Sequence, residues 1–431
     1  MSTRARPGNS ELRAQSSKLE ASPALRLRRD VVRSIRAGHP WIYAEALVPP
    51  PELLPPGAVV EVVDFAGRFL ARGLWDPGSA IAIRVFTLDP DEVLDEALVR
   101  SRFLAAAERR APILAGGGTD SCRLVHGEAD RLPGVVCDRY AAVAVLRFDG
   151  DAAASLRPWV AAVAASLPGI GTVVERPFAR CREEGQARVL HGTRPSTPIV
   201  IRENGLSFEV DVLQGHKTGL YLDQRDNRAL VRSLAAGRRT LDLFSYVGGF
   251  TVAAAAGGAG PSLSIDISKP ALAAARRNLA LNDFAFEDRE LLVADVFDWL
   301  ESPASRRRTW DLIVLDPPSL APNRAAVRRA VGAYRRLNAA ALRLAAPRAT
   351  ILTCSCSSHV DEPLFRRTVL AAATDARRRV EVVESRGASP DHPVVGWFPE
   401  GNYLKALLLR AGGASNPGGG RARRSDLPLR R

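Results

Sequence analysis

From about residue 201 to residue 410, short apolar stretches alternate with longer segments whose apolar residues recur at helical spacing. Alternation of this kind forms βαβ units, whose right-handed crossovers make the sheet parallel. The sequence therefore predicts an α/β fold with a doubly wound sheet over residues 201–410. We expect strands at 240–244, 262–266, 290–293, 311–315 and 350–354, and helices at 249–257, 269–282, 324–344 and 362–373.

Acidic residues accompany the carboxyl ends of four of these strands. They are Asp242, Asp266, Asp295 and Asp316. A carboxylate at that edge of a parallel sheet accepts hydrogen bonds from ribose hydroxyls or from an adenine amino group. One such residue alone would more often cap the following helix. Four of them at βα spacing indicate an adenosine site.

The first of these strands leads into a glycine turn, within the segment Leu241–Phe250. A turn of this kind lets a nucleotide approach the backbone. It differs from the G-x-G-x-x-G turn of nicotinamide enzymes, and no Lys-Ser or Lys-Thr pair follows it, as a P-loop would require. S-adenosylmethionine is therefore the expected cofactor. The expected binding residues are Asp242, Phe244, Ser245, Tyr246, Gly248, Asp266, Asp295 and Asp316.

The first two hundred residues have a different pattern. Strand-like runs at 58–64, 69–75 and 81–86, separated by Pro/Gly turns, predict a small β-barrel over residues 24–88. A helical pattern at 92–110 and strand patterns at 143–148 and 172–175 predict an α+β unit over residues 89–200. The polar ends, 1–23 and 411–431, are predicted to be a disordered leader and a flexible basic tail.

Charge and cysteine content narrow the classes of function. The net charge of +13 favours a polyanionic partner such as RNA, with an indifferent basic surface as the alternative. No apolar run reaches the roughly 18 residues of a membrane span, and none follows the N-terminal arginines as in a secretory signal. The five cysteines lack zinc-ligand spacing, so we expect no metal site. We expect them to be free thiols and the protein to be cytoplasmic.

Two cysteines, Cys354 and Cys356, lie at the end of the fifth strand with alternate-residue spacing. A thiolate that adds to C6 of cytosine makes C5 nucleophilic enough to take a methyl group. A carboxyl group near N3, here Asp316, assists by protonating the ring or bonding to it. The other interpretation of a cysteine in an apolar strand is a small buried hydrophobe. One cysteine of the pair is expected in the core and the other at the site.

The segment Asp316-Pro-Pro-Ser319 also permits a different chemistry. It is similar to the (Asp/Asn)-Pro-Pro-aromatic signature of enzymes that methylate an exocyclic amino group. In those enzymes the aromatic side chain stacks on the base, and here Ser319 takes that position. Methylation of a base amine is therefore the alternative reaction. A third possibility is an RNA-binding ribosome assembly factor without turnover.

Eight motifs along the chain identify a protein family. They are Gly38–Ile42, Phe69–Gly73, Arg123–Gly134, Lys217–Arg228, Asp316–Pro318, Ser355–Ser357, Asp391–Pro393 and Tyr403–Lys405. Through these motifs the chain resembles the bacterial PUA-domain-containing cytosine-5 methyltransferases of 23S ribosomal RNA. The resemblance implies a PUA barrel, an α+β middle domain and a class I methyltransferase domain that uses S-adenosylmethionine. It also implies that RNA is the partner and that Cys356 is the nucleophile, with Cys354 at a tolerant position.

The chain departs from the family pattern at two places. Ser319 follows Asp-Pro-Pro where members often carry Lys, and Ser357-Ser-His-Val360 follows the cysteine where some members carry Ser-Gly-Leu-Met. The second departure bears on which nucleotide is modified rather than on the reaction.

The segment Lys217–Arg228 has two interpretations. As a lid over cofactor and RNA it would use Lys217, Tyr221, Gln224 and Arg225 as contacts. Equally, it is a helix-capping network that joins two domains. The sequence does not determine the oligomeric state, and a homodimer is one of the states that it allows.

Overall fold

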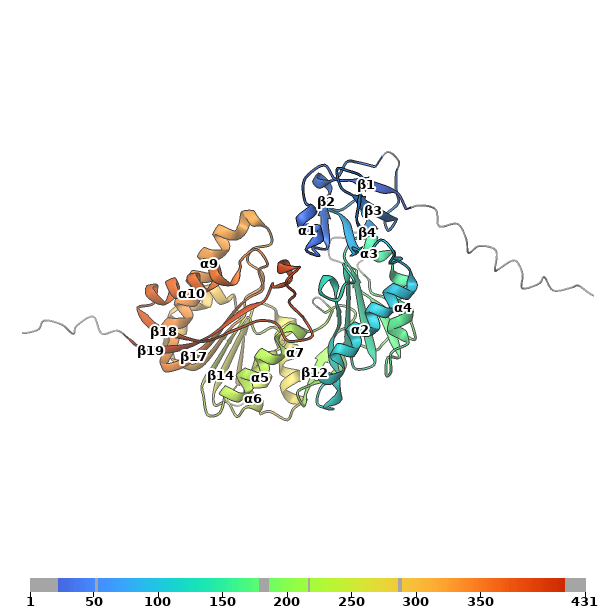
Figure 1. Ribbon diagram of the computed structural model, residues 1–431. Coiled ribbons are helices and arrows are strands. Elements are labelled where there is room, and N and C mark those ends of the chain that lie inside the picture. Colours follow the sequence, from blue (N-terminus) through green and yellow to red (C-terminus); the bar gives the residue numbers. More distant parts are fainter. Residues whose placement is uncertain (1–21, 51–52, 178–185, 216–217, 286–288, 415–431) are drawn as a thin grey trace, which may run out of the picture.

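The computed structural model describes residues 22–50, 53–177, 186–215, 218–285 and 289–414. Two five-stranded sheets, a hairpin and a seven-stranded sheet make up its β-structure. Figure 1 shows the seven-stranded sheet and its helices as one body, beside a second body that holds both five-stranded sheets. Most of the predicted leader and tail, together with Cys181 and Lys217, falls outside the described residues.

The first sheet confirms the small barrel, in a half-closed form. Its edges approach each other after β1 and β2, where Leu27 bridges Leu47 and the Val48 amide donates to Arg26 O at 2.9 Å. Helix α1 (Val32–Arg36) and the 3-10 turn η1 (Ala44–Ala46) connect the strands. The strand order is β1 (Ala24–Arg26), β3 (Val59–Val63), β4 (Phe69–Trp75), β5 (Ile81–Thr87) and β2 (Trp41–Tyr43).

The second sheet packs beneath this barrel and shares its core. Leu74 and Phe86 of the barrel join Phe103 of helix α2 (Glu96–Ala115) in one apolar cluster. Helix α2 begins later than predicted because Asp95 caps it, accepting from the Leu98 amide at 2.9 Å. The strand order is β10 (Arg188–His191), β9 (Thr172–Glu175), β8 (Val143–Phe148), β7 (Val135–Tyr140) and β6 (Ser121–His126), with 3-10 turn η2 (Gly127–Asp130) and helices α3 (Asp151–Ala154) and α4 (Arg157–Ala165).

A hairpin and a helix connect the two bodies. Strands β11 (Ile199–Glu203) and β12 (Leu206–Val210) pair in an antiparallel ladder, so the domain boundary drawn between residues 200 and 201 cuts through β11. That boundary is corrected, because a hydrogen-bonded hairpin belongs to one unit. The 3-10 turn η3 (Leu222–Gln224) and helix α5 (Arg225–Leu234) follow.

The seven-stranded sheet is the predicted doubly wound sheet. Its strands β13 to β17 are parallel, and β19 runs antiparallel to both of its neighbours. The order is β15 (Arg289–Val293), β14 (Ser262–Asp266), β13 (Thr240–Leu243), β16 (Trp310–Leu315), β17 (Ala345–Ser355), β19 (Lys405–Ala414) and β18 (Arg378–Arg386).

Helices cover both faces of this sheet. On one face Ile313 and Leu315 pack with Tyr334 of α9, and on the other Leu312 and Val314 pack with Phe250 of α6. Because side chains alternate along a strand, one strand supplies both cores. The covering helices are α6 (Gly249–Ala256), α7 (Lys269–Ala280), α8 (Val296–Glu301), α9 (Val327–Leu344) and α10 (Glu362–Asp375). The 3-10 turns η4 (Pro303–Arg307), η5 (Arg324–Ala326) and η6 (Pro399–Gly401) lie in the connecting segments.

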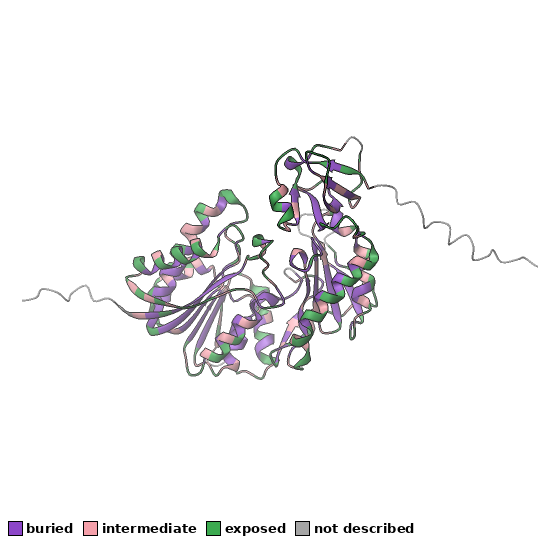
Figure 2. Cartoon of the chain, viewed as in Figure 1, coloured by how far each residue is buried: buried purple, intermediate pink, exposed green. Residues whose placement is uncertain are grey.

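The carboxyl-terminal boundary is also corrected. Strand β19 continues to Ala414, so the flexible tail does not begin at residue 411. The pairing of Ala411 with Val380 of β18 holds the strand in the sheet there. Figure 2 shows the sheets buried and the outer helix faces exposed. Among the described residues, no helix is both long enough and apolar enough to span a membrane.

Candidate active site

The turn after β13 is a strained loop that only glycine can complete. Phe244 and Tyr246 have φ angles of 65° and 49°, and Gly248 has a φ of 77°. A Cβ at Gly248 would lie 2.8 Å from Cβ of Ala275 in α7. The Ser245 amide donates to Ile265 O at 3.0 Å, which ties the loop to β14. The loop backbone thus stays open to a ligand at the carboxyl edge of the sheet.

Asp266, the last residue of β14, holds this loop in place. One carboxylate oxygen accepts from the Tyr246 amide at 2.9 Å, and the other accepts from the Ser268 amide at 2.8 Å. The residue is half-buried. Each carboxylate oxygen accepts more than one hydrogen bond, so Asp266 retains acceptor capacity for ribose hydroxyls.

Asp242 lies beneath the loop rather than at the edge. It is inside β13 and 2% exposed, which corrects the expectation that it stands at the strand end. Thr251 of α6 donates to Asp242 Oδ2 at 2.7 Å, and burial raises the pKa of Asp242 to about 7. Neither Asp242 Oδ1 nor the Ser245 hydroxyl has a hydrogen-bond partner among the described residues.

Asp295 caps a helix, which was the alternative to adenosine binding for each of the four acids. Its Oδ1 accepts from the Phe297 amide at 2.7 Å at the start of α8. The Phe297 ring meets the Phe244 ring edge-on, with centroids 6.1 Å apart. Phe297 was not identified from the sequence, although an aromatic residue two positions after a strand-end acid was a visible signal.

These residues suit an adenosyl group. The half-buried rings of Phe244 and Phe297 offer an apolar surface for the adenine, and Asp266 offers a carboxylate for the ribose. Asp242 Oδ1 and Ser245 Oγ are buried polar atoms that lack partners within the described part of the chain. Such atoms cost free energy unless a ligand or water bonds to them.

The two cysteines are separated by burial. Cys354 has no exposed surface and packs with Leu312 and Leu352. Burial raises the pKa of the Cys354 thiol well above its usual range. Cys356, just beyond the end of β17, is half-buried, and its Sγ lies 3.9 Å from Pro317 O. The structure therefore places Cys356, and not Cys354, beside the Asp316-Pro-Pro segment.

Both serines around Cys356 anchor its loop. The buried Ser357 Oγ accepts from the amides of Leu320 and Ala321 at 3.0 and 3.1 Å. Its hydroxyl lies 2.9 Å from Tyr334 Oη, to which Ser355 also donates at 2.9 Å. Tyr334 was not identified from the sequence. This network joins the cysteine loop to the segment after Asp316, which is half-buried at the end of β16.

Of the candidate lid contacts, Tyr221 approaches the cofactor loop. The Tyr221 ring meets the Tyr246 ring edge-on, with centroids 5.5 Å apart, and burial raises the pKa of Tyr221. The negative forms of Tyr246, Cys356 and Asp316 raise that pKa further. Tyr221 therefore contacts the cofactor loop through Tyr246.

Gln224 and Arg225 are buried instead, which favours the network interpretation. Arg225 is 3% exposed and binds both oxygens of Asp391 at 2.9 and 3.0 Å. Gln224 is 2% exposed, and its amide oxygen accepts from Asn227 at 2.6 Å. The expectation that these two side chains contact RNA is corrected, because a buried side chain engaged in this way cannot reach a phosphate.

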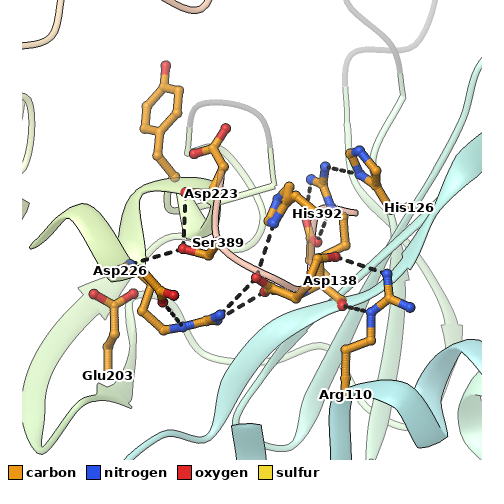
Figure 3. Close-up of polar contacts among 12 residues, drawn as sticks. Arg110, His126, Asp138, Glu203, Asp223, Asp226, Ser389 and His392 are labelled. Atoms are coloured by element: carbon orange, nitrogen blue, oxygen red, sulfur yellow. Dashed lines mark hydrogen bonds and ion pairs between the residues drawn. The ribbon is translucent and has the colours of Figure 1, made fainter. Parts of the chain in front are cut away.

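The loop that carries Asp391 joins the two bodies of the molecule, and its neighbours Ser389 and His392 are labelled in Figure 3. Asp391 Oδ2 accepts from the Arg123 amide of β6 at 2.9 Å, and Arg110 of α2 donates to Asp391 O at 3.0 Å. Arg110 also pairs with Asp130 at 2.7 Å. The adjacent His392 and the guanidinium of Arg225 hold the pKa of Asp391 well below its usual range, despite its burial. We give the name junction network to Asp391, Arg123, Arg110, Asp130 and Arg225.

A cavity of about 470 Å³ lies where the half-closed barrel meets the same loop. Trp397, 42% exposed, forms one wall, and Arg36 and Arg131 line the cavity. Gly38, with a φ of 93°, allows close approach, since a Cβ there would lie 3.3 Å from Cβ of Trp397. The cavity thus combines an open aromatic face with two arginines and three acids, Asp89, Glu92 and Glu128.

Two protein families match the chain. Residues 161–410 match the S-adenosylmethionine-dependent methyltransferase family, and residues 25–88 match the PUA-like domain. The chain is 38% identical over 391 residues to ribosomal RNA large subunit methyltransferase I of Shewanella denitrificans, covering 90% of this chain and 98% of that protein. It is 39% identical over 409 residues to a ribosomal RNA large subunit methyltransferase of Deinococcus radiodurans, covering 92% and 99%.

Solved structures agree on the fold. A methyltransferase crystallised with SAH superimposes with a TM-score of 0.79 at 22% identity, over 90% of this chain and 100% of that one. A methyltransferase of Streptococcus mutans gives the same values.

Proposed function

The chain belongs to the family of S-adenosylmethionine-dependent methyltransferases that carry a PUA-like domain, and from that premise we propose that it methylates C5 of a cytosine in 23S ribosomal RNA. The observation that carries this proposal is the position of Cys356. Its sulfur lies against the Asp-Pro-Pro segment, whereas Cys354 is sealed in the core.

The glycine loop, Asp266 and the pair Phe244 and Phe297 would hold S-adenosylmethionine. When bound there, the cofactor supplies an electrophilic methyl group. Asp242 and Ser245 lie behind the loop and offer the cofactor buried polar atoms. Asp295 shapes the adenine end by capping α8, which fixes Phe297.

Cys356 is the proposed nucleophile. Its thiolate bonds to C6 of the cytosine, and the electron pair displaced from the C5–C6 double bond makes C5 nucleophilic. The carboxylic acid form of Asp316 assists by donating a hydrogen bond to N3. After C5 has gained the methyl group, a base removes the C5 proton and the bond between Sγ and C6 breaks. The thiolate is thereby regenerated, and the enzyme returns to its starting state once the base has released the C5 proton to solvent.

The RNA is proposed to bind along the barrel and the cavity at Trp397. Unpaired bases stack on exposed aromatic rings, and arginines such as Arg36 and Arg131 pair with phosphates. The names of the relatives support large-subunit ribosomal RNA as the proposed substrate. Within this proposal the enzyme acts in the cytoplasm, where ribosomal RNA is made and assembled.

The reaction can be tested with RNA that carries tritium at C5 of cytosine. Methylation at C5 replaces that hydrogen, so tritium should pass to water in step with methyl incorporation. In Cys356→Ala both signals should vanish, while Cys354→Ala, the matched control, should retain them because its thiol lies in the core.

The rival reaction gives a different result. Methylation of an exocyclic amine leaves the C5 hydrogen in place, so methyl incorporation without tritium release would overturn the proposal. Binding of RNA and cofactor with neither signal would indicate an assembly factor instead.

A further inference from the structure

Lys405 is a buried lysine that touches the cysteine loop. It is 2% exposed and is the first residue of β19, where it pairs with Ser355 of β17. Its Nζ donates to Ser357 O and to Tyr403 O, both at 2.7 Å. One of these carbonyls belongs to the residue that follows Cys356. Lys405 therefore holds the loop of the proposed nucleophile from behind.

The surroundings of this lysine are unusual for a buried cation. Both of its acceptors are neutral carbonyls, and no carboxylate of the described residues forms an ion pair with it. A buried charge is costly unless it is paired. The negative groups within electrostatic reach are the Cys356 thiolate and Asp361, before α10. The cation is thus placed where Cys356 can supply the counter-charge.

Other titratable groups face Cys356 from the neighbouring elements. Tyr221 lies on the cofactor side, and Tyr334 of α9 holds the flanking serines. Asp316 and Cys354 lie on the side of β16 and β17. Of these groups and Asp361, Lys405 is the basic one.

Resting on the function proposed above, we propose that Lys405 is a positioning residue whose ammonium group stabilises the thiolate of Cys356. The thiol proton leaves to solvent, the Lys405 charge stays, and the resulting ion pair relieves the isolation of both groups. Burial lowers the pKa of Lys405 to about 8, so the side chain is charged at neutral pH and loses its charge above that value. The stabilisation of the thiolate is therefore present at neutral pH.

A purely mechanical role would use the same two hydrogen bonds. Glutamine and methionine separate the two possibilities at position 405. Lys405→Gln keeps two N–H donors for the carbonyls of Ser357 and Tyr403 but removes the charge. Lys405→Met removes both. If only the clamp matters, Lys405→Gln should resemble the wild type.

The experiment measures the rate at which iodoacetamide alkylates Cys356 as a function of pH, with the label located by peptide mass spectrometry. We expect both Lys405→Gln and Lys405→Met to react about tenfold more slowly at pH 7, because a thiol titrating about one pH unit higher holds about tenfold less thiolate there. Tyr334→Phe is the matched control. It loosens the loop without changing a charge at neutral pH, so its titration midpoint should match the wild type.

A wild-type alkylation rate in Lys405→Gln would overturn the proposal. Should both variants fail to fold, judged by thermal melting, the wild type decides the matter. Its thiolate absorbance, with Cys356→Ser as the blank, should appear below the usual midpoint of about pH 8.5, and a midpoint at or above that value would overturn the inference.

These measurements need neither RNA nor turnover. Tritium release can therefore fail while the effect of Lys405 on the thiol persists, which would overturn the function alone. The reverse result would overturn the role of Lys405 alone.

Discussion

The junction network and the cofactor loop both contain buried aspartates, yet they use them differently. Asp391 receives the guanidinium of Arg225 and the amide of Arg123. Asp242 has one donor, Thr251, and its second oxygen has no partner among the described residues. A fully paired buried acid stabilises the fold, whereas a partly paired one next to an open loop indicates a ligand site.

The largest effect expected from this comparison is at the junction. Arg225→Met leaves Asp391 buried without its cation and should lower the free energy of unfolding by about 3–5 kcal/mol, measured in urea. The affinity of the folded protein for S-adenosylmethionine should stay unchanged. Arg239→Met breaks the exposed pair with Asp311 and is the control, with a cost below about 1 kcal/mol. A cost as small at Arg225 would contradict the structural role of the junction.

Asp242 should make stability depend on pH. Its pKa is about 7 in the folded state, so between pH 4 and 7 the folded protein holds a proton that the unfolded chain has released. Raising the pH through this window should cost up to about 1.4 kcal/mol per pH unit from this residue. Asp242→Asn should remove that slope. If the free energies of unfolding of the two proteins, measured in urea, changed with pH in the same way, Asp242 would not be a protonated acid in the folded state.

Asp266 should affect the cofactor rather than the fold. Asp266→Asn keeps an acceptor for the Tyr246 amide but loses the acceptor for the Ser268 amide and the charge toward the ribose. A hydrogen bond to a charged group contributes about 1.5–3 kcal/mol, so the affinity for S-adenosylmethionine in calorimetry should fall about 10- to 100-fold. Asp298→Asn, an exposed acid on α8, is the control. Equal affinities in both variants would remove Asp266 from the binding site.

The smallest effect is expected at the cavity of the barrel. Trp397→Ala should weaken RNA binding by about 1–3 kcal/mol, the value of one stacked base, without changing the salt dependence. Val394→Ala removes another exposed apolar side chain of the same loop and should have no effect. Loss of salt dependence in Trp397→Ala would mean that the substitution disturbs phosphate contacts instead of stacking.

The strands of the parallel sheet were predictable because each is a short apolar run between turn residues. The predicted bounds of β14, 262–266, match the structure, as do those of β8, 143–148. Strands β18 and β19 were not predicted. Basic and acidic residues alternate with valines along β18, an edge strand, and β19 merges into the polar carboxyl-terminal segment without a turn signal.

The site was predictable only as far as local spacing reaches. The acids at the end of β14 and after β15 and β16 follow from the βα repeat, but the inward direction of Asp242 depends on its place within the strand. The partner of Arg225 lies 166 residues along the chain, so its burial could not be inferred from the motif around it. Lys405 was part of a motif, yet its contacts are backbone carbonyls, which carry no sequence signal.

The most direct test of the central claim uses RNA in which 5-fluorocytosine replaces cytosine, incubated with the enzyme and S-adenosylmethionine. Fluorine cannot leave as a proton does, so the bond between Cys356 and C6 should persist and the RNA should stay attached on a denaturing gel. The adduct should vanish in Cys356→Ala and survive in Cys354→Ala. Loss of the adduct in Cys354→Ala alone, or no adduct while ordinary RNA is still methylated, would contradict Cys356 as the nucleophile.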